Sequence, residues 1–105
     1  MIIVTTNDIP NRKVAQTLGI VRGSTIRARH VGRDILAGLR NVVGGEIHEY
    51  VKLMGEAREQ AIDRMVDEAR KLEGDAILGV RFATSMIMTG AAELMVYGTA
   101  VKLED

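Results

Sequence analysis

The chain has 105 residues, a length typical of one domain, which we expect to span residues 1–105. Its 14 basic and 14 acidic residues give a formal net charge of zero, so no global field attracts nucleic acid or an anionic membrane. The absence of cysteine excludes disulfides, thiolate metal sites and cysteine nucleophiles.

The N-terminal residues 1–6 form a β-branched run, which predicts a short strand. Turn-forming residues follow at 7–11 and include Pro10, the only proline of the chain. No basic segment leads into a long apolar one, so we expect neither a signal peptide nor a membrane-spanning helix. The cytoplasm is therefore the expected compartment.

Residues 14–29 are rich in valine, isoleucine and threonine and predict a second strand. Gly19 and Gly23 lie inside it. Glycine within a strand usually marks a bulge, a bend or a close approach of another backbone. We therefore expect either one long, bent strand or two short ones.

Two helices are predicted next. Residues 33–43 carry apolar side chains at helical spacing from Ile35 onwards, and Gly44-Gly45 end the pattern. Residues 46–73 predict a longer, charge-rich helix. Its apolar positions recur every three or four residues and predict the face that packs on the sheet, namely Met54, Ala57, Ala61, Met65, Ala69 and Leu72.

Residues 76–88 and 92–103 predict two more strands, joined by a turn at 89–91. Both strands are apolar at nearly every position, so both of their faces should be covered. The long helix would cover one face, and a second subunit would cover the other. Together these elements predict an α+β domain with a mainly antiparallel sheet, a long helix packed on it and assembly as a homo-oligomer.

The arginines are the main candidates for ligand binding. Residues 11–40 hold seven basic residues and a single acid, Asp34. Arg27, Arg29 and Arg33 could bind a small anion such as a phosphate or carboxylate group, with Asp34 on the same surface. Alternatively, these arginines pair with Asp34 or with acids of the long helix. In a ring, each subunit would repeat this basic patch around the axis, and the summed positive charge could form an anion site.

Histidine offers a second possibility, a metal site. His48 lies with Glu46 and Glu49 at the start of the long helix, and imidazole with carboxylates can bind a divalent metal. The spacing matches no zinc motif, and the three positions do not share one helix face, so a solvated helix start is the alternative. His30 lies among arginines, a poor place for a cation. We therefore expect no cofactor, with a divalent metal as the alternative.

The sequence contains no recognisable catalytic motif. The segment between Gly19 and Gly23 lacks the Gly-Lys-Ser/Thr ending of a phosphate-binding loop. Met86, Met88 and Met95 could offer thioethers to copper(I), although core packing is the simpler interpretation. The serines and threonines have no neighbouring base that suggests a nucleophile. An enzyme is therefore not the expected function.

Three segments occur together in a distinctive order and spacing. The first is Gly19-Ile20-Val21-Arg22-Gly23. The second runs from Arg33-Asp34 through Leu36-Ala37-Gly38-Leu39-Arg40 to Gly44-Gly45, followed by Tyr50 and Ala57-Arg58-Glu59. The third is Asp75-Ala76-Ile77-Leu78-Gly79-Val80, together with Gly98-Thr99-Ala100-Val101. In that order they resemble the YbjQ-like family, and the resemblance covers nearly the whole chain. This family consists of small bacterial and archaeal proteins and is sometimes labelled as heavy-metal-binding.

The resemblance implies an α+β subunit of the YbjQ-like/dodecin-like kind, assembled into a ring-shaped homopentamer. Many members have a cysteine immediately before the first glycine of the 19–23 segment, whereas this chain has Leu18, so no thiolate site can exist there. We therefore predict a non-enzymatic, homo-oligomeric binding protein that takes a small ligand and has no nucleic-acid or membrane partner. A metal-binding protein without cysteine ligands is the alternative.

Overall fold

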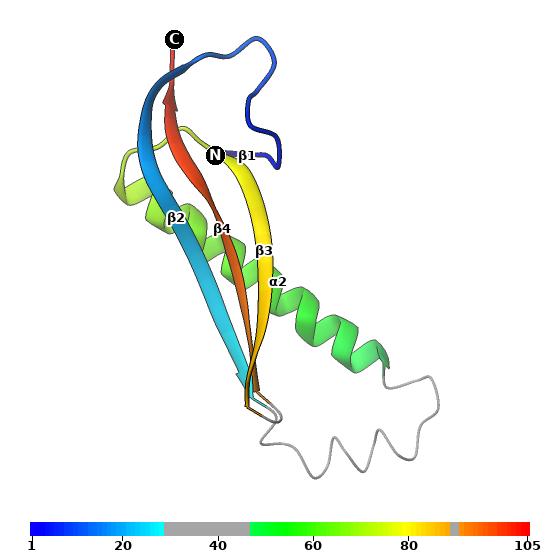
Figure 1. Cartoon of the computed structure of the whole chain (residues 1–105). Helices are drawn as coiled ribbons and strands as arrows, with labels where there is room; N and C mark the ends of the chain where they lie inside the picture. Colours follow the sequence, from blue (N-terminus) through cyan, green and yellow to red (C-terminus); the bar gives the residue numbers. More distant parts are fainter. Residues whose placement is uncertain (29–46, 89–90) are drawn as a thin grey trace.

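The computed structural model describes residues 1–28, 47–88 and 91–105 and has a small single-domain α+β fold (Figure 1). Its elements are, in chain order, strand β1 (Ile2–Ile3), strand β2 (Val14–Ala28), helix α2 (Ile47–Lys71), strand β3 (Ala76–Met88) and strand β4 (Ala91–Leu103). The strands form one mixed sheet in the order β1-β3-β4-β2. β1 pairs with β3 in parallel, and the other two pairs are antiparallel.

The predicted α+β class, the mainly antiparallel sheet and the long helix packed on it are confirmed. The long strand and the two C-terminal strands are observed within one residue of their expected bounds. The strand expected at residues 1–6 is regular only over Ile2–Ile3, although main-chain hydrogen bonds to β3 continue as far as Thr6. The helix predicted at residues 33–43 and most of the turn at 89–91 lie outside the described residues.

Strand β2 is one long strand with a bend, as its glycines predicted (Figure 1). Gly19 has a φ angle of +126°, and the register with β4 shifts between Thr17 and Gly19, which marks a β-bulge. Gly23 is a point of close approach. A Cβ atom built there would lie 2.0 Å from the carbonyl oxygen of Ala61 in α2. The missing side chain at position 23 therefore lets the helix lie directly on the strand.

Helix α2 packs its small-residue face mainly on β2 and β4 (Figure 1). Four residues of the predicted apolar stripe are completely buried, namely Ala57, Ala61, Met65 and Ala69. Ala61, Met65 and Ala69 form one core with residues of the strands, including Val21 and Val96. Leu72 departs from the prediction: it is 42% exposed, since the helix ends at Lys71 before the stripe does.

A second, smaller core lies on the opposite face of the sheet. Ile77 belongs to the core under α2, whereas its neighbours Ala76 and Leu78 point to the second core, as alternation along a strand requires. Val4 and Ile9 from the N-terminal segment pack against this second core. The N-terminal segment of the same chain therefore covers this face at the start of β3 and the end of β4, while Ile26 remains exposed on the same face.

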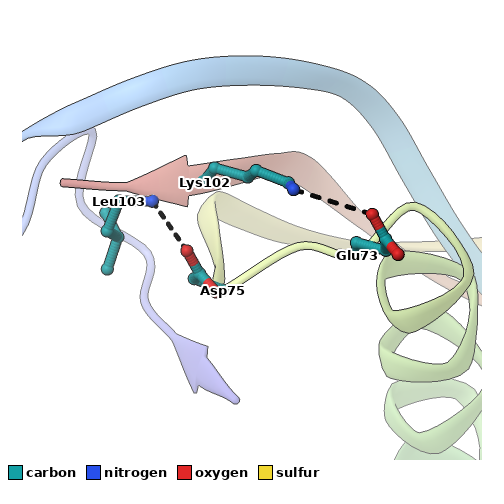
Figure 2. A network of polar contacts seen from close by, with 4 residues as sticks. All are labelled: Glu73, Asp75, Lys102 and Leu103. Atoms are coloured by element: carbon teal, nitrogen blue, oxygen red, sulfur yellow. Dashed lines mark hydrogen bonds and ion pairs between the residues drawn. The ribbon is translucent and has the colours of Figure 1, made fainter. Parts of the chain in front are cut away.

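Polar contacts join the loop before β3 to the end of β4. An Oδ2 atom of Asp75 accepts a hydrogen bond of 2.9 Å from the backbone N–H of Leu103 (Figure 2). The backbone N–H of Asp75 donates to the carbonyl oxygen of Val101 at 2.8 Å. Lys102 and Glu73 approach to 3.7 Å beside them, but both are exposed, so this ion pair adds little stability. Asp75 therefore fixes the start of β3 against the end of β4.

Candidate functional site

The described sheet exposes large apolar side chains on both of its faces. Met86 is 81% exposed and lies opposite Ala92, on the face that α2 only partly covers. Ile26 is 60% exposed and lies opposite Glu93, on the other face. Further exposed apolar residues of the three long strands are Ile20, Phe82, Ile87 and Tyr97. A surface of this kind is typical of an interaction site.

The core-packing interpretation of the methionine cluster is wrong for Met86, because this side chain is mostly in solvent. Met86 lies opposite Ala92 and Met95 lies opposite Ala83, so their positions in the ladder differ by an odd number of residues. Side chains at such positions point to opposite faces of the sheet. Met86 and Met95 therefore do not converge on a copper(I) ion, and the side chain of Met88 lies outside the described residues.

The two edges of the sheet leave main-chain groups open. Within the described residues, β2 pairs with β4 along one side and has no strand on its other side. On the opposite edge, β1 pairs with β3 at Ala76 and Ile77, and main-chain hydrogen bonds from Val4 and Thr6 extend this cover only as far as Val80. Open edges of this length are templates for pairing with another chain. A hydrogen bond of 2.5 Å from Nη1 of Arg64 occupies one edge carbonyl of β2, that of Ser24.

Arg27 is the described member of the predicted ligand set and lies at the end of β2 beside α2. Its Nη2 donates a hydrogen bond of 2.8 Å to Oε1 of Gln60, and its Nε is buried with no partner among the described residues. It borders an open hollow of about 510 Å³. The other residues of this hollow carry more acid than base: Lys52, Gly55, Glu56, Glu59, Gln60 and Asp63. Arg27 therefore stands beside an acidic stretch of its own helix.

The other predicted ligand residues, Arg29, Arg33 and Asp34, lie outside the described residues, so the structure does not place them beside Arg27.

The side chains of the predicted metal ligands also lie outside the described part of the structure. Glu46 and His30 lie outside it altogether, and His48 and Glu49 are described only as backbone of α2. Among the described side chains, no group of three or more His, Cys, Asp or Glu residues could hold a metal ion. Leu18, the residue before Gly19, packs against the core under α2.

A second hollow, of about 390 Å³, lies between β2 and the last two turns of α2. The residues that line it are Arg22, Gly23, Ser24, Arg64, Asp67, Glu68 and Lys71. Val21 and Gly23 face α2, so the side chain of Arg22 between them points to the opposite face of the sheet. No spacing in the sequence signals this site. Its lining comes from two elements far apart in the chain, and only the packing of α2 on β2 forms it.

Within the described ranges, no helix combines the length and the apolar content needed to cross a membrane. α2, the helix that is described, carries charged residues along its whole length.

Known proteins match this chain along nearly its whole length. A family model described as "Putative heavy-metal-binding" matches residues 1–104. A UPF0145 protein of Methanosarcina acetivorans is 58% identical over 103 residues, which cover 98% of this chain and 97% of that protein. A UPF0145 protein of Vibrio parahaemolyticus is 48% identical over 105 residues, which cover 100% of both chains.

A solved structure has the same fold. It is a protein of the DUF74 family from Pediococcus pentosaceus, which superposes with a TM-score of 0.66 and covers 99% of this chain and 98% of its own. The two sequences are 18% identical. At that identity the likeness supports the fold alone.

Proposed function

Since the chain belongs to the YbjQ-like family, whose model matches residues 1–104, we propose that it is a homo-oligomeric binding protein and not an enzyme. The observation that carries the proposal is the apolar surface on both faces of the sheet, defined above by Met86, Ile26 and their exposed neighbours. Burial of that surface against other copies would stabilise the assembly by about 25 cal/mol per Å² of apolar area removed from water.

The dimensions of the subunit support self-association. Its Cα radius of gyration is 17.4 Å, and its principal extents are 56 × 23 × 16 Å. A compact domain of about 100 residues has a radius of gyration of about 13 Å. The subunit is therefore long and thin, and within the described residues much of the sheet has no covering element. Neighbouring copies would supply that covering.

The open edges of the sheet suggest how copies meet. In cyclic closure, the free edge of β2 in one copy could face the free edge of β3 in the next, so that no edge remains exposed. The family resemblance implies five copies in such a ring. Native mass spectrometry of untagged protein tests this assembly directly.

We propose a small anion as the ligand, bound at Arg27 together with Arg29, Arg33 and Asp34. The described geometry of Arg27 supports this assignment. Among the described residues, Gln60 is the one hydrogen-bond partner of its five N–H donors, and Nε has none. Guanidinium groups with free donors bind carboxylate and phosphate groups through paired hydrogen bonds.

Citrate should raise the melting temperature of the wild-type protein at low ionic strength, where charge interactions are least screened. Arg27→Ala and Arg33→Ala should each remove this thermal protection, because each deletes a cation of the proposed site. Differential scanning fluorimetry at a fixed protein concentration measures both effects. Equal protection of the wild type and both variants would contradict the anion site.

The family description favours one alternative, a metal-ion binding protein. The ligands would be His48 with Glu46 or Glu49, or His30, since the chain has no cysteine. A metal held in this way would travel with the protein through purification without chelators. The mass of the native assembly would then exceed that of the polypeptide by a stoichiometric amount of metal.

A further inference from the structure

A row of two arginines and a tyrosine crosses the face of the sheet that is turned away from α2. Strand β4 lies between β2 and β3 (Figure 1). Arg22 of β2 pairs with Tyr97 of β4, and Tyr97 pairs with Arg81 of β3. Side chains at paired positions of neighbouring strands stand beside one another on the same face. We infer that this row binds a small linear dicarboxylate.

The contacts of β2 establish which face carries the row. The hydroxyl of Thr25 donates a hydrogen bond of 3.3 Å to the carbonyl oxygen of Ala57 in α2, and Val21 belongs to the core under α2. Since side chains alternate along a strand, Arg22 points to the other face. The row therefore lies on the opposite side of the sheet from Arg27, and the two anion sites share no residue.

Arg81 is held at one end of the row by the main chain. Its Nη1 donates hydrogen bonds of 2.9 Å to the carbonyl oxygens of Thr5 and Val80. Thr5 belongs to the N-terminal segment that runs along the outer edge of β3, so these bonds hold the guanidinium group towards that edge. An arginine fixed in this way loses little further side-chain entropy on binding a ligand, and it has other N–H donors besides those on Nη1.

The spacing of the row determines the shape of the ligand. Neighbouring strands lie about 4.8 Å apart, so the Cα atoms of Arg22 and Arg81 are separated by two such spacings, roughly 10 Å. Because Arg81 is held towards the outer edge, the two guanidinium groups do not close on one compact anion such as phosphate. A linear diacid can place one carboxylate at each arginine through paired hydrogen bonds. Its apolar chain would then lie over Tyr97, which is 38% exposed.

The charge of the row also favours a dianion. Among the described residues, neither Arg22 nor Arg81 has a carboxylate within 4.0 Å. Glu93 is the nearest acid among the paired strand positions of this face. It lies four residues before Tyr97 on β4, roughly 13 Å along the strand. Two cations without a neutralising acid attract an anion, and two carboxylates match them in number.

A diacid at this row would also favour assembly of the subunits. Tyr97 belongs to the apolar surface that we propose is covered by other copies. Burial of an arginine without a partner is costly, and a bound carboxylate at each arginine would reduce that cost. The row itself lies within one subunit, so its residues are in place before assembly.

Isothermal titration calorimetry of the full chain with glutarate, at low ionic strength, tests the inference. The wild type should bind one glutarate per subunit, and acetate, with a single carboxylate, should bind at least tenfold more weakly. Arg22→Ala and Arg81→Gln should each weaken glutarate binding at least tenfold, because each removes one cation. Glutamine at position 81 keeps an N–H donor for the carbonyl oxygen of Thr5. Arg58→Ala, which removes an exposed arginine of α2, is the control and should leave the affinity unchanged.

Arg22→Ala is the decisive variant, because Arg22 makes no side-chain hydrogen bond within the described residues and its truncation should leave the fold intact. Two results would overturn the inference: no glutarate binding by the wild type, or equal affinities in Arg22→Ala and Arg58→Ala. Glutarate binding that is lost in Arg27→Ala but kept in Arg22→Ala would assign the diacid to the Arg27 site and also contradict the inference. A monomeric wild type that binds glutarate would refute the proposed assembly and leave this site standing.

Discussion

Replacement of Gly23 by alanine is expected to destabilise the fold by about 3 kcal/mol or more, at or above the upper end of the range for overpacking a core. The new Cβ atom would lie 2.0 Å from the carbonyl oxygen of Ala61 and 2.5 Å from the amide nitrogen of Met65. Both are backbone atoms and cannot rotate away, so α2 would have to move off β2. Chemical denaturation at a fixed protein concentration measures the loss.

Gly55→Ala is the matched control for this prediction. Gly55 lies inside α2, and the nearest atom to a Cβ built there is Nη2 of Arg58 at 3.9 Å. Alanine is the better helix former, so this variant should be more stable than the wild type by about 0.5–1 kcal/mol. Equal effects of the two substitutions would mean that α2 does not rest on β2 at Gly23.

Truncation of Met65 should have the second-largest effect, a loss of about 2–5 kcal/mol for Met65→Ala. Met65 is completely buried and is the largest side chain of α2 that reaches the core with Val21 and Val96. Its removal leaves a cavity bounded by two strands and the helix, which can collapse only partly. Urea denaturation of the purified variant gives the change in unfolding free energy.

Leu72→Ala controls for the general cost of shortening an apolar side chain. The sequence places Leu72 on the same stripe as Met65, but the structure leaves it 42% exposed after the end of α2. We expect Leu72→Ala to cost less than about 1 kcal/mol, because it creates no enclosed cavity. A Leu72→Ala loss as large as that of Met65→Ala would contradict the described position of the helix end.

The long elements could be predicted because their patterns are local. The alanine and methionine spacing of α2 identified its buried face, and the glycines at 19 and 23 identified the bulge and the close approach in β2. Each of these depends on residues within a few positions of one another. The exposure of Leu72 could not be read from the pattern, because the stripe continues beyond the point where the helix ends.

Two features could be identified only from the three-dimensional structure. The apolar character of β3 and β4 predicted that both faces are covered, but only the structure shows that Val4 and Ile9 supply part of that cover. The hydrophobic pattern predicts that a face of the sheet is buried, but it does not identify the residues that cover that face. Likewise, the hollow between β2 and the last two turns of α2 depends on the contact between these elements, which no spacing in the sequence signals.

The candidate anion site was only partly accessible to sequence reasoning. Charge asymmetry pointed to Arg27, and the structure gives that residue an unpartnered Nε within the described part of the chain. Its surroundings on α2 are acidic, because Glu56, Glu59 and Asp63 belong to the solvent-facing side of a helix whose other side is buried. The proximity of these acids to Arg27 follows from packing and not from the order of residues.

The central claim is that the exposed sheet surface is an interface between copies. Native mass spectrometry of untagged protein, prepared without chelators, tests it most directly. We predict a homo-oligomer, with the family resemblance implying five times the mass of the 11.5-kDa chain. The double variant Ile26→Glu and Met86→Glu should shift this species to the monomer while preserving the helix content, because both positions are exposed in the isolated subunit.

A wild-type protein that is monomeric at micromolar concentration would contradict the claim. In that case the apolar surface of the sheet would have to serve some contact other than self-association. A homo-oligomer that the double variant leaves intact would also contradict it, since the interface would then lie elsewhere on the subunit.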